Sequence, residues 1–300
     1  MKKLVEAMLR SKLLWVAGGA VILAAPAALA WRAYSAEVRV FFPKRHPLTV
    51  PLAQAGILNL QALSIEGRNQ KLGAWYAPSR NGATIVICHG AGGDRSQLLD
   101  EARALATHGF GTLMFDWPGH GESDGVSSWH DAERQSLHAV LDWFEKQPEA
   151  KGQSIGALGF SLGGYILVQV ATSRTGISSL ALVGTPSNLN QQVRLAHQNW
   201  RLIREPAARF ALSTHGIDLG EPQPAHLIGK FAPAPVLVIG GGRDGTVPPQ
   251  LTRELFDAAG DPRQLYFIDA AEHGSYALSG GAAYLSRVVE HFQHTLLPKP

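Results

Sequence analysis

The sequence predicts one α/β domain with a largely parallel central sheet and helices on both of its faces. From residue 83 onward, strand-like and helix-like segments alternate, and such βαβ alternation is typical of parallel sheets. Glycine-rich loops follow several of the strand-like runs, at the sheet edge where open α/β sheets place their ligands. The chain has 300 residues, a length that a single α/β domain with a short leader commonly reaches.

The individual elements follow from the spacing of apolar residues. Gly56 to Pro78 is predicted to form two antiparallel edge strands ahead of the alternation. Ala83 to Cys88 is rich in β-branched residues, which indicates a strand. Asp131 to Gln147 carries apolar residues at intervals of three and four, which indicates a helix. Asp94 is a candidate N-cap for the next helix. The other predicted elements are strands over 112–115, 155–160, 178–183, 235–240 and 264–268 and helices over 98–107, 163–171, 249–259 and 282–297.

A candidate nucleophile lies at Ser161, within the pentapeptide Gly159-Phe160-Ser161-Leu162-Gly163. The pentapeptide fits the G-x-S-x-G nucleophile elbow, in which a sharp strand-to-helix turn forces the serine outward. A bare match is a weak signal, but a strand-like run precedes this one and an apolar helical run follows it. The helix start also offers free N–H groups to a developing anion.

A nucleophilic serine needs a base, and the base needs an orienting acid. Asp244 follows the strand-like run 235–240, and His273 follows the run 264–268. Each alone would be read as an ordinary loop residue. Together, in this order and each beyond a strand, they are predicted to be the acid and the base. Glu272 is a weaker candidate acid, because adjacency to His273 points the two side chains apart.

A candidate oxyanion hole follows the strand over 83–88, where the chain reads His89-Gly90-Ala91-Gly92-Gly93. This loop is similar to the H-G-G-G loops that supply one oxyanion N–H, while the residue after the serine supplies the other. The expected donors are therefore the main chains of Ala91 and Leu162. His89 is interpreted as a structural loop residue. Cys88 is the only cysteine, so no intrachain disulfide is expected.

Together these residues resemble the α/β-hydrolase superfamily, in the serine-hydrolase branch that includes esterases, lipases and peptidases. The resemblance covers residues 57–297, and Thr112 to Ser123 is similar to the family's D-x-x-G-x-G-x-S segment. Trp117-Pro118 departs from that pattern, because it stands where a Tyr or Trp and an Arg are common, so the family's loop-stabilising arginine is not expected at this position. The resemblance implies an α/β-hydrolase fold with Ser161, Asp244 and His273 as a catalytic triad. A serine at the elbow argues against dehalogenases and epoxide hydrolases, which resemble this family but carry an aspartate there.

One long insertion, Ser187 to Phe231, interrupts the alternation. Val193, Ala196, Trp200 and Ile203 form an apolar stripe at helical spacing, which predicts a small helical cap over the active site at about 187–231. The alternative is that the stripe packs on the sheet. Trp200 is expected either in the core or in the wall of the substrate pocket. Such an apolar cap favours uncharged, short-to-medium apolar esters.

The amino terminus predicts export. Four basic residues precede Leu13 to Trp31, which contains no charge and is about long enough to cross a bilayer. Residues 1–31 are therefore expected to be an inner-membrane anchor with the following domain on the periplasmic side. The alternative is a signal peptide cleaved near Ala30, which would give a secreted protein. Residues 32–55 are expected to be a linker or wrapping segment, and residues 56–300 the hydrolase domain.

Charge and composition reduce the number of functional classes that the sequence is compatible with. Beyond residue 12, 23 basic residues (27−4) face 23 acidic ones (24−1), so no nucleic-acid partner is expected. No cysteine–histidine cluster suggests a metal site, and no cofactor is expected. The sequence predicts a serine hydrolase that cleaves an ester, thioester or amide through an acyl-enzyme, a carboxylic ester foremost. Its substrate would be a small molecule or lipid-like. The alternatives are a serine peptidase with the same triad and a non-catalytic binding domain.

Overall fold

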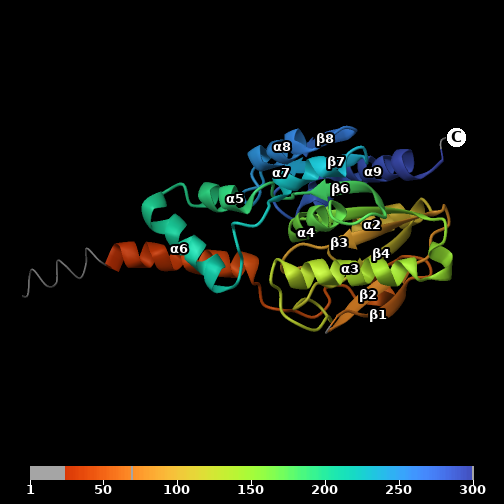
Figure 1. Ribbon diagram of the computed structural model, residues 1–300, viewed down its shortest axis with the longest axis horizontal. Helices are drawn as coiled ribbons and strands as arrows, with labels where there is room; N and C mark the ends of the chain where they lie inside the picture. Colours follow the sequence, from red (N-terminus) through yellow and green to blue (C-terminus); the bar gives the residue numbers. More distant parts are fainter. Residues whose placement is uncertain (1–23, 69, 299–300) are drawn as a thin grey trace, which may run out of the picture.

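The computed structural model describes residues 24–68 and 70–298. Its centre is an eight-stranded sheet of order β1-β2-β4-β3-β5-β6-β7-β8 (Figure 1). The β2 strand pairs antiparallel with both β1 and β4, and the other pairs are parallel, which confirms the predicted fold class. The strands are β1 (Gln61–Glu66), β2 (Lys71–Ala77), β3 (Ala83–Cys88), β4 (Gly111–Phe115), β5 (Ser154–Phe160), β6 (Ile177–Val183), β7 (Val236–Gly241) and β8 (Arg263–Ile268).

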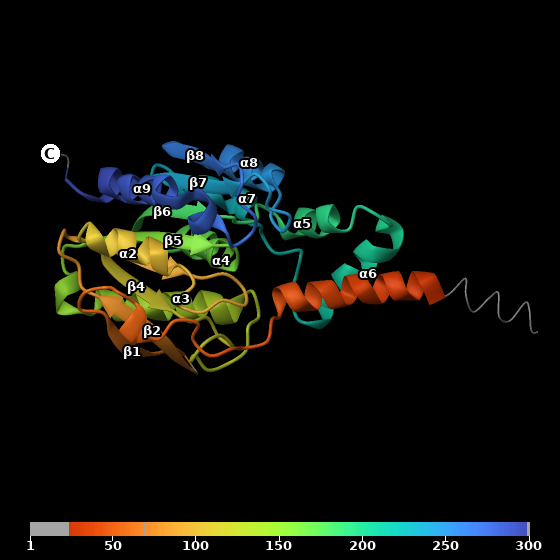
Figure 2. The ribbon, with the colours of Figure 1, turned by 180° about the vertical axis from the view of Figure 1, so that it is seen from behind.

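Helices cover both faces of this sheet, as its buried central strands require. Side chains alternate along a strand, so β3 sends Val86 and Cys88 to one core cluster and Ile85 and Ile87 to the other. The first cluster lies beneath α3 and α4, and the second lies beneath α2 and α9 (Figures 1 and 2). The main helices are α2 (Leu99–Thr107), α3 (Asp131–Glu145), α4 (Leu162–Ala171), α8 (Pro249–Ala258) and α9 (Tyr276–Leu296).

One local prediction was incomplete and another was wrong. A helix does begin after Gly281, as expected from residue 282, but Gly281, at φ 52°, separates it from a further helical stretch that starts at the buried Tyr276, and α9 includes both. Asp94 caps no helix, since Leu98 is the N-cap of α2. Its buried carboxylate instead accepts the Ser96 N–H at 2.7 Å and the Thr49 N–H at 2.8 Å. It therefore fastens the loop after β3 to the incoming chain.

The insertion between β6 and β7 is helical, but the apolar residues that were expected to form one stripe on one helix belong to two separate helices. It contains α5 (Leu189–Ala196), α6 (Arg201–Thr214), α7 (Pro224–Leu227) and the 3-10 helix η3 (Ile228–Phe231). Val193 is buried, whereas Trp200 has a left-handed backbone (φ 57°) and a side chain that is 68% exposed. The backbone turns at Trp200, so α6 does not continue the axis of α5. Trp200 is therefore not a core residue, and the core prediction was wrong.

The amino-terminal part of the described chain packs on the insertion. Residues 24–41 form a helix that α6 crosses obliquely in both views and that projects beyond the sheet (Figures 1 and 2). Its buried Glu37 contacts His197 at 2.6 Å, and its Tyr34 ring lies 6.3 Å from that of Phe210. We call helix 24–41 and α6 together the arm. Residues 1–23 of the expected anchor lie outside the described residues, and no helix within 24–68 or 70–298 is long and apolar enough to cross a membrane.

Candidate active site

Ser161 lies in the turn between β5 and α4, where the chain leaves the sheet within one residue. Its backbone has φ 52° and ψ −115°, a left-handed conformation that is costly for a residue with a side chain. The flanking glycines are required by space. A Cβ on Gly159 would lie 2.6 Å from the Gly164 nitrogen, and a Cβ on Gly163 would overlap the Cys88 carbonyl. The local sequence therefore permits a strained turn that few others could adopt.

The structure brings Ser161, His273 and Asp244 together at the carboxyl ends of three strands. His273 Nε2 lies 3.1 Å from Ser161 Oγ, and His273 Nδ1 lies 2.7 Å from Asp244 Oδ2. The loops after β5, β7 and β8 carry the three residues, which are distant in sequence. Ser161 and Asp244 are both buried, at 8% and 3% exposure, so their hydrogen bonds are shielded from water. The arrangement can deprotonate the serine hydroxyl through the imidazole.

Four hydrogen bonds fix the Asp244 carboxylate. Oδ1 accepts the N–H groups of Thr246 at 2.9 Å and Val247 at 2.7 Å, and Oδ2 accepts the Tyr276 hydroxyl at 2.6 Å besides His273. Burial, with the charge of Asp244, raises the pKa of Tyr276, so this hydroxyl stays a donor. The sequence reasoning missed Tyr276. Its position three residues after the histidine, at the start of a helix, was the available signal.

Glu272, the weaker candidate acid, points elsewhere. The residue is exposed, and its main-chain N–H donates to Ser275 Oγ at 2.9 Å. Within the part of the chain that the structure describes, its carboxylate makes no hydrogen bond to His273. The geometry therefore favours Asp244 as the partner of the imidazole.

The loop that carries Ala91 lies against the Ser161 turn. The strands that end at these two loops, β3 and β5, are parallel neighbours, with Cys88 paired to Gly159. A Cβ on Gly90 would come within 3.3 Å of the Ser161 Cβ. Leu162 is the first residue of α4, where a helix N–H has no intrahelical acceptor. The two expected oxyanion donors thus belong to adjacent turns at the same edge of the sheet.

Two buried histidines join the loop that carries Ala91 to the loop after β4. His89 Nε2 accepts the Trp117 N–H at 3.1 Å, and His120 Nε2 accepts the Gly92 N–H at 3.1 Å. Their Nδ1 atoms face the carbonyls of Gly90 and Pro118, which fixes the neutral tautomer with hydrogen on Nδ1. Burial lowers the pKa of both side chains to about 4. His89 is therefore a structural acceptor, as interpreted from the sequence, whereas the role of His120 was missed.

Arg95, in the loop after β3, is the arginine that stabilises the loop after β4, where Trp117-Pro118 departs from the family pattern. Arg95 is buried, and its Nη1 lies 3.2 Å from Asp116 Oδ2, while its other terminal nitrogen pairs with Glu122. Burial raises the pKa of Asp116 to about 6, and the Arg95 charge opposes that rise. This ion pair joins the loop after β3 to the loop after β4.

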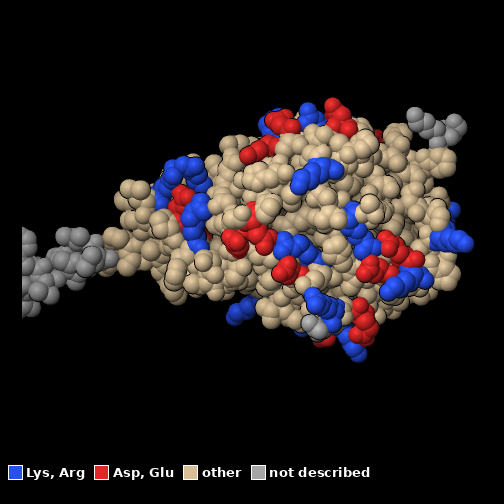
Figure 3. All heavy atoms as spheres, viewed as in Figure 1, with Lys and Arg blue, Asp and Glu red and all other residues tan. Residues whose placement is uncertain are grey.

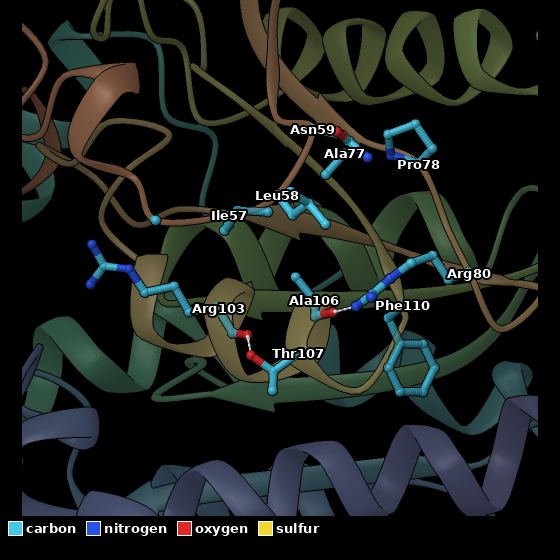
Figure 4. A pocket seen from close by; sticks show the side chains of 11 residues that line it. Ile57, Leu58, Asn59, Ala77, Pro78, Arg80, Arg103, Ala106, Thr107 and Phe110 are labelled. Atoms are coloured by element: carbon cyan, nitrogen blue, oxygen red, sulfur yellow. Dashed lines mark hydrogen bonds between the residues drawn. The ribbon is translucent and has the colours of Figure 1, made fainter.

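One hollow of the fold lies at the other end of the sheet, away from Ser161. A concavity of about 320 Å³ is bordered by residues just before β3 and β4, among them Arg80 and Phe110 (Figure 4). Its arginines are already engaged, because Arg80 donates to the Ala106 carbonyl at 2.7 Å and Arg103 to the Ala55 carbonyl at 2.8 Å. Open α/β sheets bind ligands at the carboxyl ends of their strands. The hollow is therefore not part of the candidate site.

Comparison with known proteins agrees with this fold. A family model described as "alpha/beta hydrolase fold" matches residues 83–218. The chain has the α/β-hydrolase fold. The esterase Pf2001 of Pyrococcus furiosus superposes on it with a TM-score of 0.70 at 20% identity, covering 85% of this chain and 99% of the esterase. XC6422 of Xanthomonas campestris, described as an a/b serine hydrolase without lid, superposes with a TM-score of 0.59 at 19% identity, covering 85% and 100%.

Sequence relatives span most of this α/β-hydrolase-fold protein. Rv2307c, an uncharacterized protein of Mycobacterium tuberculosis, is 27% identical over 253 residues, covering 83% of this chain and 84% of its own. YfhR of Escherichia coli K12, also uncharacterized, is 26% identical over 238 residues, covering 76% and 78%. The resemblance to the α/β-hydrolase superfamily inferred from the motifs is confirmed by the family match and the fold.

The two buried histidines predict an acid-sensitive fold. Their folded pKa of about 4 lies below the ordinary value of 6.5, so the unfolded chain binds more protons between these pH values. The free energy of unfolding should therefore fall as pH is lowered from 6.5 to 4. Asp116, with its raised pKa, opposes part of this fall. His120→Gln keeps an acceptor but does not titrate, so urea unfolding should show a pH slope smaller by about one proton. An unchanged slope would contradict the neutral assignment.

Proposed function

We propose that this α/β-hydrolase-fold protein is a serine hydrolase that cleaves a carboxylic ester, thioester or amide, with esters foremost. The observation that carries the proposal is the hydrogen-bonded series Ser161–His273–Asp244, built on a strained turn at the carboxyl ends of the strands. Similar solved structures include an esterase and an a/b serine hydrolase. A peptidase could use the same three residues, and a non-catalytic binding domain would have no need to retain all three.

In the proposed reaction, Ser161 Oγ attacks the substrate carbonyl while His273 Nε2 accepts the hydroxyl proton. The main-chain N–H groups of Ala91 and Leu162 donate to the oxyanion, and losing one such donor commonly costs about 3 kcal/mol of transition-state stabilisation. His273 then gives its proton to the leaving group, which departs and leaves an acyl-enzyme. Water, deprotonated by the same imidazole, releases the acid. Asp244 orients the ring and stabilises its charged form.

We further propose that residues 1–31 anchor the protein in the inner membrane, with the hydrolase domain on the periplasmic side. The apolar, uncharged run Leu13 to Trp31 and the basic residues before it motivate this placement. One structural observation favours the uncleaved anchor over a signal peptide. The helix over 24–41 runs without a break through Ala30 and buries Ala33 and Glu37 against the rest of the chain. Cleavage near Ala30 would cut this packed helix.

The nucleophile is tested by Ser161→Ala. We expect hydrolysis of a p-nitrophenyl ester to fall by about 10³-fold or more, because the residues of a triad act as a unit. Thermal unfolding followed by circular dichroism should show that the variant is folded. Ser173→Ala, in the turn just after the carboxyl end of α4, is the matched control and should retain parental turnover. Near-parental turnover by Ser161→Ala would rule out the assignment.

The acid is tested by comparing two carboxylates. Asp244→Asn should lower kcat by up to about 10⁴-fold, because the amide no longer holds His273 in the productive tautomer. Glu272→Gln removes an exposed carboxylate one residue from the histidine and should leave kcat almost unchanged. Steady-state kinetics of both variants show which of the two carboxylates orients His273. Equal losses, or a larger loss for Glu272→Gln, would move the acid away from Asp244.

A further inference from the structure

The outward face of α6 is apolar and uncovered. Leu202, Pro206 and Phe210 recur at intervals of four residues, so they form one stripe along the helix. Leu202 is 93% exposed and Phe210 is 63% exposed, whereas Ala208 and Leu212, on the other side of the helix, are buried. Single exposed apolar residues are ordinary, but a contiguous stripe on a projecting element marks an interaction surface.

Aromatic side chains extend this stripe onto the neighbouring helix. The Trp31 ring stacks on Tyr34 at 5.8 Å, and Tyr34 lies 6.3 Å from Phe210. Trp31 and Trp200 are each 68% exposed. Tryptophan and tyrosine are enriched at the boundary between lipid headgroups and acyl chains, because their rings are amphipathic. The composition of this face therefore fits a lipid surface.

Between the two helices of the arm lies a basic groove. Leu29, Arg32, Asn199, Trp200 and Arg204 border a concavity of about 470 Å³. In the described ranges, neither Arg32 nor Arg204 pairs with a carboxylate, whereas Arg201 and Arg209 both pair with Glu205. Figure 3 shows basic side chains on this projecting end, gathered around a single acidic patch. The two unpaired guanidinium groups suit phosphate groups, which arginine binds with two parallel hydrogen bonds.

We propose that the projecting end of the arm, around Arg32 and Arg204, is a membrane-docking surface that meets the headgroup layer of an anionic bilayer where the anchor leaves it. Arg32 and Arg204 would contact lipid phosphates, while Trp31 and Leu202, near the same end of the arm, would reach the acyl boundary. The inference rests on the proposed anchoring, which also selects this occupant. In sequence, residues 13–23 immediately precede helix 24–41 and are uncharged and largely apolar, so an anchored chain would enter the bilayer next to this end of the arm. An acyl ester presented at the membrane surface is the substrate class that this docking favours.

The chain offers a selective way to test the surface. Cys88 is the only cysteine, and it is fully buried, so an introduced exposed cysteine can be labelled alone. Leu202→Cys carries an environment-sensitive NBD fluorophore on α6. Leu58→Cys is the matched control, since Leu58 is 70% exposed and lies beside the hollow at the opposite end of the sheet (Figure 4). Full-length labelled protein is reconstituted into vesicles of phosphatidylethanolamine and phosphatidylglycerol.

With docking, NBD at position 202 emits at shorter wavelength and is quenched several-fold more strongly by nitroxide lipids than NBD at position 58. Aqueous iodide should quench NBD at position 58 more strongly than NBD at position 202. Adding Arg32→Gln and Arg204→Gln should remove most of the lipid quenching at position 202, as should replacing phosphatidylglycerol with phosphatidylcholine, because each arginine near an anionic surface contributes about fivefold in partitioning.

Three results would overturn the inference, and they are distinguishable. If the protein floats with vesicles but both labels are equally open to iodide, the docking surface is wrong and the anchoring stands. If the protein does not float, both the anchoring and the docking are wrong. If the label at position 202 is shielded without vesicles and in proportion to protein concentration, a second copy of the chain covers the face. Ester hydrolysis in detergent solution tests the proposed reaction independently of all three.

Discussion

At Ser161 the backbone leaves β5 and enters α4 through one left-handed residue, a conformation that costs on the order of 1–3 kcal/mol. Such strain persists only where the surroundings over-determine it. Every residue of α4 is buried, and β5 is paired on both sides within the sheet, so the two elements fix the turn between them. The glycines at positions 159 and 163 allow the close approach that this packing imposes. The candidate active site depends on this one constraint.

A second set of contacts ties the loop after β3 to the amino-terminal chain. His46 Nε2 lies 2.7 Å from the Gly92 carbonyl, and Thr49 Oγ1 donates to Asp94 at 2.6 Å. Just upstream, the Phe41 carbonyl at the end of helix 24–41 accepts the Trp129 Nε1–H at 2.7 Å. The arm and the expected oxyanion loop are therefore connected by a short, hydrogen-bonded stretch of chain. Docking of the arm would fix the orientation of the candidate site relative to a membrane.

The sequence predicted the sheet because local signals determine it. Alternating apolar runs and glycine-rich loops specify strands, helices and the order of loops, and the structure brings together Ser161, Asp244 and His273, the residues read from those loops. The contacts it missed are tertiary. Tyr276 reaches Asp244 because α9 starts early, and His120 reaches Gly92 across two loops. The prediction of one continuous apolar stripe through Trp200 was wrong, because the spacing of apolar residues contains no information about the left-handed turn of the backbone at Trp200.

The central claim is that Ser161 attacks an acyl carbon, and trapping a covalent adduct tests it most directly. The full-length protein is incubated with a fluorophosphonate, digested, and mapped by tandem mass spectrometry. The account predicts one adduct per chain, on the peptide that contains Ser161, and no adduct after the protein is unfolded before treatment, because the reactivity depends on the folded site. An adduct on another residue, or hydrolysis of esters that persists without any adduct on Ser161, would contradict it.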